Sequence, residues 1–366
     1  MNKYIENLHE ETRKYFEILS SEFPEWLLEY IDTPEMERLG NISLSCGMDY
    51  SGCFKIHHWY SNLDHSVGVA LIIWHFTHDK KQTLAGLFHD ISSPAFRHCI
   101  DFMNGDSETQ ESTEEGIIDF IRNSKKIMSL LERDGIKLEE VYDYKIYPIA
   151  DNNTPRLSAD RFEYTFSSGL TFFRVFDIGE IKEIYSNIVI VKNEDGKDEL
   201  AFKDKEVCEH YIHILSKLWP EWVSDRDRTA MQFLADICKS MSIAGYLTID
   251  DLYKLSESEI ISKILNCGDA YLSESFKKFQ TADTVYVSDA FVDGKYCVNT
   301  KTKTRYVCPL VLTEKGVFRI NEVSEQANNE IYDYLTLSKG GYYTYFDFEF
   351  TPYETGKTLS KKDFNK

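Results

Sequence analysis

Two apolar stretches joined by a short polar link constrain the fold of this chain more than any other feature. The first, "NLDHSVGVALIIWHF" at residues 62–76, is long and apolar enough for a buried helix. Ser61 or Asn62 can cap its start, and Asp64 suits its positive end. The second stretch, residues 82–91, predicts another buried helix directly after the first.

Helical patterns continue through most of the first 275 residues. The further segments that show them are residues 1–40, 113–133, about 157–180 and 205–265. One segment differs: "SNIVIVKNEDGKDELAF", residues 186–202, alternates around Asp195-Gly196, which predicts a β-hairpin. The sequence therefore predicts a mainly α fold with a β-hairpin insertion.

The sequence changes character after about residue 280. Segments such as "DTVYVSDAFVDGKYCV" and "GGYYTYFDFEF" are rich in β-branched and aromatic residues and contain Gly turns, which is typical of strands. One helix is expected near residues 322–337. We therefore predict a helical core over residues 1–275 and a smaller α+β or β-rich C-terminal region over residues 276–366.

The charge and composition exclude several kinds of partner. The chain has 366 residues and a formal net charge of −20, whereas proteins that grip nucleic acid normally present a basic face. Small anionic substrates are not excluded, because a local site can be basic or hold a metal. No segment resembles a signal peptide or approaches the roughly 20 apolar residues of a membrane helix. The eight cysteines form no C-x-x-C motif, so we expect a cytoplasmic protein with reduced thiols.

The stretch "LAGLFHDISSPAFRHCID", residues 84–101, ends an apolar helix in His89-Asp90. An unpaired buried charge is costly, so this pair needs partners. A metal ion would satisfy both side chains, and a buried ion pair with a backbone cap is the alternative. His65 on the first apolar helix and Asp160 in "RLSADRFEYTF" add further ligand types. Two histidines with two carboxylates suit Mn, Fe, Ni, Zn or Mg rather than a thiolate metal.

The break at Ser92-Ser93-Pro94 predicts the start of a third helix. Ser at the N-cap and Pro at the first helical position are typical of a helix start, and Asn104-Gly105 would end it. The N-terminus of this helix would turn free N–H groups and a positive dipole end toward a phosphate.

One His, a His-Asp pair and a distant Asp on apolar helices resemble the HD-domain metal-dependent phosphohydrolases. In that family four such residues hold a divalent metal inside a helical bundle, and the resemblance implies these ligands: His65, His89, Asp90 and Asp160. The motifs "MERLGNISLSCG", "NLDHSVGVA", "LAGLFHDISSPAFRH" and "ADRFEY", within about residues 36–180, are similar to the deoxynucleoside triphosphate triphosphohydrolase branch. Members of that branch often assemble, so the resemblance also implies a homo-oligomer.

The chain departs from that branch at positions that handle phosphate and protons. Asn62 stands where the branch places a phosphate-binding Arg, and Ser93 stands where it places a His. The nearest match to the His-Glu pair of the branch is Gln110-Glu111. The resemblance therefore implies an intact metal site with altered triphosphate and proton-transfer groups.

We expect the metal to activate a water molecule that attacks a phosphate ester. The candidates for proton transfer are Asp101, His98 and Glu111, of which the first two match acidic and histidine positions of the branch. The candidates for substrate binding are Asn62, Arg97, Arg161 and Tyr164. Structural roles are the alternatives: a solvated acidic loop for Glu111, the core for Tyr164 and the surface for Arg97.

Three functions fit these features. The first is a metal-dependent phosphohydrolase acting on a phosphate ester of a nucleotide or a nucleotide-like substrate. The second is a deoxynucleoside triphosphate triphosphohydrolase. The third is a regulatory module that binds metal and nucleotide but has lost catalysis, to which the altered positions point.

Overall fold

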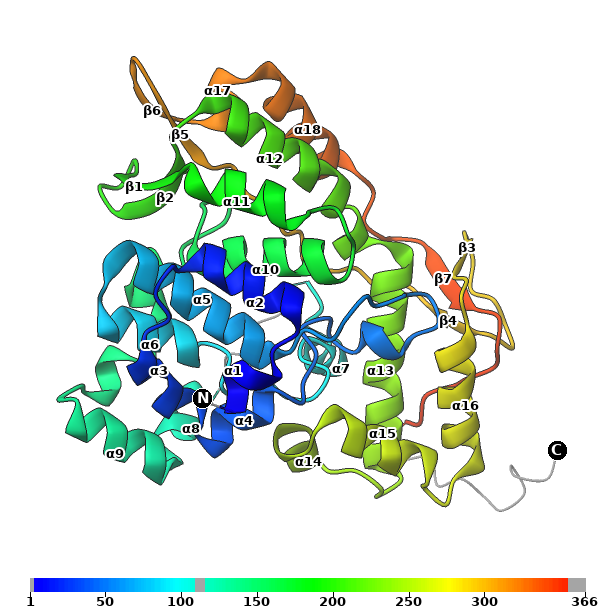
Figure 1. The fold of residues 1–366 in the computed structure, drawn as a ribbon. Helices are drawn as coiled ribbons and strands as arrows, with labels where there is room; N and C mark the ends of the chain where they lie inside the picture. Colours follow the sequence, from blue (N-terminus) through cyan, green and yellow to red (C-terminus); the bar gives the residue numbers. More distant parts are fainter. Residues whose placement is uncertain (1–2, 109–115, 355–366) are drawn as a thin grey trace.

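The computed structural model describes residues 3–108 and 116–354, which are mainly helical, as predicted (Figure 1). The helices before residue 200 are α1 (Lys3–Asn7), α2 (Glu10–Leu19), α3 (Glu25–Ile31), α4 (Pro34–Leu39), α5 (Asn62–Thr77), α6 (Lys80–Phe88), α7 (Cys99–Asn104), α8 (Ile117–Asn123), α9 (Lys125–Arg133), α10 (Ala159–Thr171) and α11 (Ile178–Ser186). Those after it are α12 (Lys205–Leu218), α13 (Asp225–Ile243), α14 (Ile249–Lys254), α15 (Glu257–Leu265), α16 (Ala270–Thr281), α17 (Ile320–Val323) and α18 (Glu325–Thr336). None of these helices is both long enough and apolar enough to span a bilayer.

Helix α5 lies in the larger hydrophobic core, with α2, α4, α6 and α10 packed against it. Val67, Ala70 and Ile73 are fully buried, which confirms the predicted buried helix. Ser61 caps its start: the Ser61 Oγ accepts the Asp64 N–H at 3.1 Å, and the Asp64 carboxylate accepts the Ser61 N–H at 2.9 Å. This reciprocal pair of bonds fixes where the first turn of α5 begins.

The prediction that a helix starts at Ser93-Pro94 is wrong. The chain makes a series of turns after α6, and the next helix, α7, begins only at Cys99. Phe96 and Arg97 have φ angles of +62° and +44°, which an α-helix does not accept. The reason is tertiary: the Ala95 N–H donates to the Leu252 carbonyl at 2.7 Å and the Phe96 N–H to the carboxylate of Glu257 at 3.0 Å, so contacts with a distant segment hold these turns in place. The expected phosphate-binding helix start is therefore absent there.

The predicted β-hairpin is confirmed. Strands β1 (Ile188–Lys192) and β2 (Asp198–Phe202) pair antiparallel, with Ile188 opposite Phe202. Strand β2 also pairs in parallel with β5 (Leu310–Thr313), which pairs with β6 (Gly316–Arg319), so the hairpin becomes half of a four-stranded sheet. The sequence did not reveal this, because the partner strand lies more than a hundred residues later.

The C-terminal region forms a second small sheet and two helices. Strands β3 (Tyr286–Ser288), β7 (Tyr343–Phe346) and β4 (Tyr296–Val298) pair antiparallel in that order, and the predicted helix near 322–337 is α18. Helix α18 packs against α12, and β7 packs against α13 (Figure 1). Both hydrophobic clusters contain residues from each side of residue 275. The division of the chain at that residue stays a prediction.

Replacing Ser61 with Ala should lower the free energy of unfolding by about 1 kcal/mol, because it removes the two hydrogen bonds that the Ser61 hydroxyl makes with Asp64 at the buried start of α5. Urea unfolding followed by circular dichroism measures the change. The matched control is Ser256→Ala, which removes the same capping box at the exposed start of α15 and should cost less. Equal stability of Ser61→Ala and the unaltered protein would show that the cap does not hold α5.

Candidate metal centre

Four side chains meet where α5, α10 and the turn after α6 come together. The Nε2 atoms of His65 and His89 are 3.1 Å apart, and the Asp160 Oδ1 lies 3.2 Å from the first and 3.6 Å from the second. The Asp90 Oδ2 lies 3.8 Å from the His65 Nε2 and 3.6 Å from the His89 Nε2. Donor atoms about 2.1 Å from one metal ion lie about 3 Å apart when they are adjacent ligands. The donor atoms of His65, His89 and Asp160 therefore lie close enough to one another to hold one metal ion, and Asp90 lies beside them.

Each histidine is oriented by a bond at its other ring nitrogen. The His89 Nδ1 donates to the carbonyl of Gly86 at 2.7 Å, because α6 ends at Phe88 and leaves His89 in a turn. The His65 Nδ1 contacts the carboxylate of Glu163 on α10. Both arrangements leave Nε2 facing the other donors, as metal ligation requires.

Charges around the centre favour ionised carboxylates. Burial alone would raise the pKa of Asp90, but Arg97, whose Nη2 donates to the Asp90 Oδ2 at 2.6 Å, holds it below its usual range. Burial is likewise outweighed at Asp160, where His65 and His89 lower the pKa to about 2. For His65, burial alone would lower the pKa, but Glu163 and Asp160 raise it to about 9. The carboxylates of Asp90 and Asp160 are therefore negatively charged at neutral pH.

The centre lies in the wall of a cavity of about 500 Å³. Seven basic side chains and four aspartates line it, although the whole chain has a net charge of −20. The basic side chains are Arg97, Lys145, Arg156, Arg161, Lys197, Lys303 and Arg305. Aromatic side chains, including Tyr164, Phe172 and Trp222, form another part of the lining. This cavity suits a small anion that also carries an apolar or planar group.

His98 and Asp101 form a second polar pair in the same region. The His98 Nδ1 donates to the Asp101 Oδ2 at 2.9 Å, and Asp101 is fully buried. Since a carboxylate accepts at Nδ1, the lone pair of neutral His98 is on Nε2, where the Arg305 Nη2 lies 3.3 Å away. Burial and the cations Arg305 and Arg97 lower the pKa of His98 to about 4. His98 therefore lines the cavity as a neutral imidazole.

The structure brings three of the four predicted substrate-binding residues to the cavity. Arg97 is buried against Asp90 instead of lying on the surface. The Arg161 Nη1 donates to the Asn152 Oδ1 at 2.7 Å, which fixes its guanidinium in the lining. Tyr164 stacks edge-on against Trp222, with centroids 5.4 Å apart, and burial raises its pKa to about 12.

Two predicted site residues are not brought to the cavity, and one cannot be placed. Asn62 and Asp101 are fully buried and are not among the residues that line the cavity, and Ser93, which stands where the branch places a His, is also buried outside the lining. Asn62 sits at the first turn of α5, where its backbone N–H donates to the Ile42 carbonyl at 2.8 Å. The cavity therefore offers no place for Asn62 to contact a phosphate. Glu111, with its neighbour Gln110, lies outside the described residues.

Sequence reasoning missed most of the basic lining and one buried acid. Lys197 follows the hairpin turn, and Lys303 and Arg305 lie in the segment between β4 and β5. The basic run "KTKTR" at residues 301–305 was the available signal in an otherwise acidic chain. No pattern marked Glu163, because a single Glu in an apolar helix has many possible partners.

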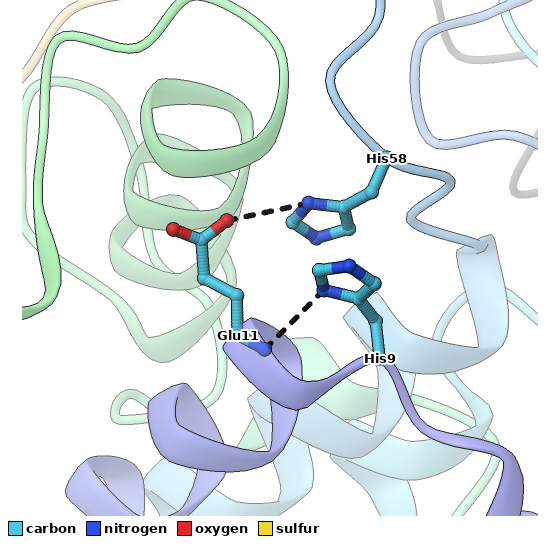
Figure 2. A group of neighbouring side chains, drawn as sticks. All are labelled: His9, Glu11 and His58. Carbon is cyan, nitrogen blue, oxygen red and sulfur yellow. Dashed lines mark hydrogen bonds and ion pairs between the residues drawn. The ribbon is translucent and has the colours of Figure 1, made fainter.

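A second His and Glu group lies away from this cavity. Figure 2 shows the imidazole rings of His9 and His58 face to face, with centroids 4.0 Å apart and planes within 11°, beside Glu11. Nitrogen lone pairs lie in the ring planes, so two stacked rings cannot direct them at one ion. The Glu11 carboxylate also accepts from Arg174 at 3.0 and 2.9 Å. This group therefore links α2 to the loop that precedes α5 and is a poor candidate for a metal site.

Two histidines and two aspartates beside a basic cavity make a candidate divalent-metal centre. Comparison with protein-family models gives no match. The chain is 22% identical over 265 residues to the uncharacterized protein YdhJ of Bacillus subtilis, covering 72% of this chain and 78% of that protein. It is 24% identical over 146 residues to the metal-dependent phosphohydrolase cns2 of Cordyceps militaris, covering 40% of this chain and 41% of that protein.

The wild-type chain should bind one divalent ion, and Asp160→Ala should abolish this binding, because the replacement removes a ligand oxygen from the centre. Titration calorimetry with Mn²⁺ measures both affinities. Asp151→Ala is the matched control, since Asp151 lines the same cavity but pairs with Arg161. Retention of the ion by Asp160→Ala would contradict the assignment.

The low pKa of His98 predicts a loss of stability in acid. The pKa is about 4 in the folded protein against 6.5 for an unperturbed His, so the unfolded chain takes up the proton first as the pH falls. The free energy of unfolding should therefore fall as the pH is lowered from about 6.5 to 4. His98 alone should account for a loss of about 2 kcal/mol at pH 5. His98→Asn removes that contribution. Its unfolding free energy, measured against pH by urea titration, should decline less steeply; two parallel curves would refute the prediction.

Proposed function

We propose that this chain is a metal-dependent phosphohydrolase of the HD type that cleaves a phosphate ester of a nucleotide or a nucleotide-like molecule. The observation that carries the proposal is the convergence of four residues beside a basic cavity: His65, His89, Asp90 and Asp160. The partial relative that is named a metal-dependent phosphohydrolase supports the reaction class. The cavity supports the substrate class by its charge and size.

The lining has separate features for the phosphate and for the rest of the substrate. The guanidinium of Arg161 is held by Asn152 and by Asp151, 3.3 Å away, so it is presented in one orientation. Its Nη1 and Nη2 atoms already donate to Asn152, Arg156 and Ser158, so Arg161 acts on a phosphate chiefly through its positive charge. Tyr164 and Trp222 offer aromatic surface to a base or another planar group. A cavity of about 500 Å³ has room for a molecule of this size.

A divalent metal at the centre supplies Lewis acidity, which activates water and polarises a phosphoryl oxygen. The residues of the chain prepare that chemistry. Arg97 keeps Asp90 ionised, and the two bonds at Nδ1 keep the Nε2 atoms of His65 and His89 directed at the centre. Asp101 holds His98 in the tautomer whose Nε2 can accept a proton.

The number of basic side chains favours one alternative, the deoxynucleoside triphosphate triphosphohydrolase, because several cations suit several phosphates. The buried positions of Asn62 and Ser93 weigh against it, since neither lines the cavity. A monophosphate or another simple ester needs fewer specific contacts and is our first choice. The third candidate is a regulatory module that binds metal and nucleotide without turnover, and an activity measurement distinguishes it from the other two.

Assembly into a homo-oligomer is also proposed, and light scattering would test it.

The proposal is tested by phosphate release from nucleoside mono- and triphosphates, with Mn, Mg, Ni, Fe, Co and Zn each supplied. We expect orthophosphate from monophosphates, lost in Asp160→Ala and kept in Asp119→Ala, which removes an exposed carboxylate paired with Arg122. Tripolyphosphate would favour the triphosphohydrolase. A metal-loaded protein without turnover on any substrate would overturn the proposal in favour of the binding module.

A further inference from the structure

Glu163 is a fully buried carboxylate that lies behind the metal centre. It is on α10, three residues after Asp160, and its Oε2 contacts the His65 Nδ1. Its Oε1 accepts the hydroxyl of Tyr60 at 2.6 Å and that of Tyr15 at 3.3 Å. The Ser167 hydroxyl donates to Oε2 at 3.2 Å. Four donors thus surround one carboxylate.

The backbone opposite Glu163 is shaped to admit this side chain. Gly68 lies on α5, three residues after His65, and a Cβ added there would be 2.6 Å from the Glu163 Oε1. Because real Cβ atoms do not approach an oxygen so closely, any larger residue would displace the carboxylate. The close approach of α5 and α10 therefore holds Glu163 in one place.

Glu163 forms its ion pair with an imidazole. Within residues 3–108 and 116–354, that contact is with His65, no Lys or Arg forms an ion pair with Glu163, and Arg97 acts on its charge from farther away. A buried carboxylate is costly unless it is hydrogen-bonded and paired. The hydroxyls of Tyr15, Tyr60 and Ser167 stabilise the ionised form, and the imidazole of His65 is the group on which its charge acts.

We propose that Glu163 is a positioning residue that sets the metal affinity of His65. It accepts the Nδ1–H of His65, which fixes the ring and keeps the Nε2 lone pair toward the metal. Its negative charge makes that nitrogen a stronger donor than it would be beside a neutral acceptor. His89, whose Nδ1–H is accepted by the neutral carbonyl of Gly86, is the weaker of the two histidine ligands. This inference rests on the proposed metal centre, but not on the substrate.

The test is the affinity of Glu163→Gln for Zn²⁺ alone, measured by competition with a chromogenic chelator. The amide keeps the size and an acceptor oxygen but removes the charge, so we expect binding about 10- to 100-fold weaker than in the wild type. The control is Glu199→Gln, which neutralises another fully buried glutamate, paired with Arg319 instead of a ligand. Its affinity should match the wild type. Thermal unfolding of both metal-free variants checks that each is folded.

A second measurement uses the unaltered protein and so does not depend on the folding of a variant. In the Zn²⁺-loaded wild type, ¹⁵N–¹H correlation spectra of the histidine side chains should show His65 protonated at Nδ1, with its proton far downfield as in a bond to a carboxylate. His65→Gln assigns the signal by its loss. The downfield signal reports the bond itself, and the Zn²⁺ affinity of Glu163→Gln reports whether that bond strengthens the ligand.

The outcomes separate this inference from the function on which it rests. A wild type that binds no Zn²⁺ overturns the metal centre and the role of Glu163 together. A folded Glu163→Gln with wild-type affinity, or a His65 protonated at Nε2 in the loaded protein, overturns the role of Glu163 and leaves the centre intact. Weaker binding by Glu163→Gln with the downfield Nδ1 proton in the wild type supports both.

Discussion

The structure depends on burying a cluster of ionisable side chains between the apolar helix α5 and the amphipathic helix α10. His65, Asp160 and Glu163 face one another there, and each is too costly to bury alone. Helix α5 is apolar over most of its length, so its capped first turn is where it can present a polar group to the core. The position of that turn decides whether the cluster is complete. The packing of the core and the geometry of the centre therefore both depend on where the first turn of α5 lies.

The charge of the cavity is opposite in sign to that of the molecule. An acidic surface disfavours nucleic acids and other large polyanions, because they contact much of the surface at once. A small anion that enters the cavity meets the basic lining instead. This distribution of charge is consistent with the small anionic substrate that we propose.

The sequence predicted the parts of the site that follow from local pattern. The buried helix at α5, its Ser61 cap and the hairpin are present, and the predicted ligands lie close together. The prediction failed at Ser93-Pro94, where the Glu257 carboxylate binds a backbone N–H from 161 residues away along the chain. Local signals of a helix start cannot report such a competitor.

The same limit explains the residues that sequence reasoning missed or misplaced. Arg97 was weighed as a surface residue, yet two positive φ angles turn it onto Asp90. Lys303 and Arg305 reach the cavity from the C-terminal region, which the sequence predicts to be separate from the helical core. Lys303 and Arg305 depend on contacts between segments far apart in the sequence, and Arg97 depends on local backbone angles; composition and periodicity encode neither.

The parallel pairing of β2 with β5 has a consequence for how the molecule is made. The metal-binding residues all precede residue 161, whereas the segment 302–305 that completes the cavity wall is synthesised much later. Contacts of such long sequence separation form slowly, because closing a long loop costs entropy before the contact repays it. During synthesis the centre can assemble in an open groove, and only the finished chain encloses it. The cavity is therefore enclosed only after residues 302–305 have been synthesised.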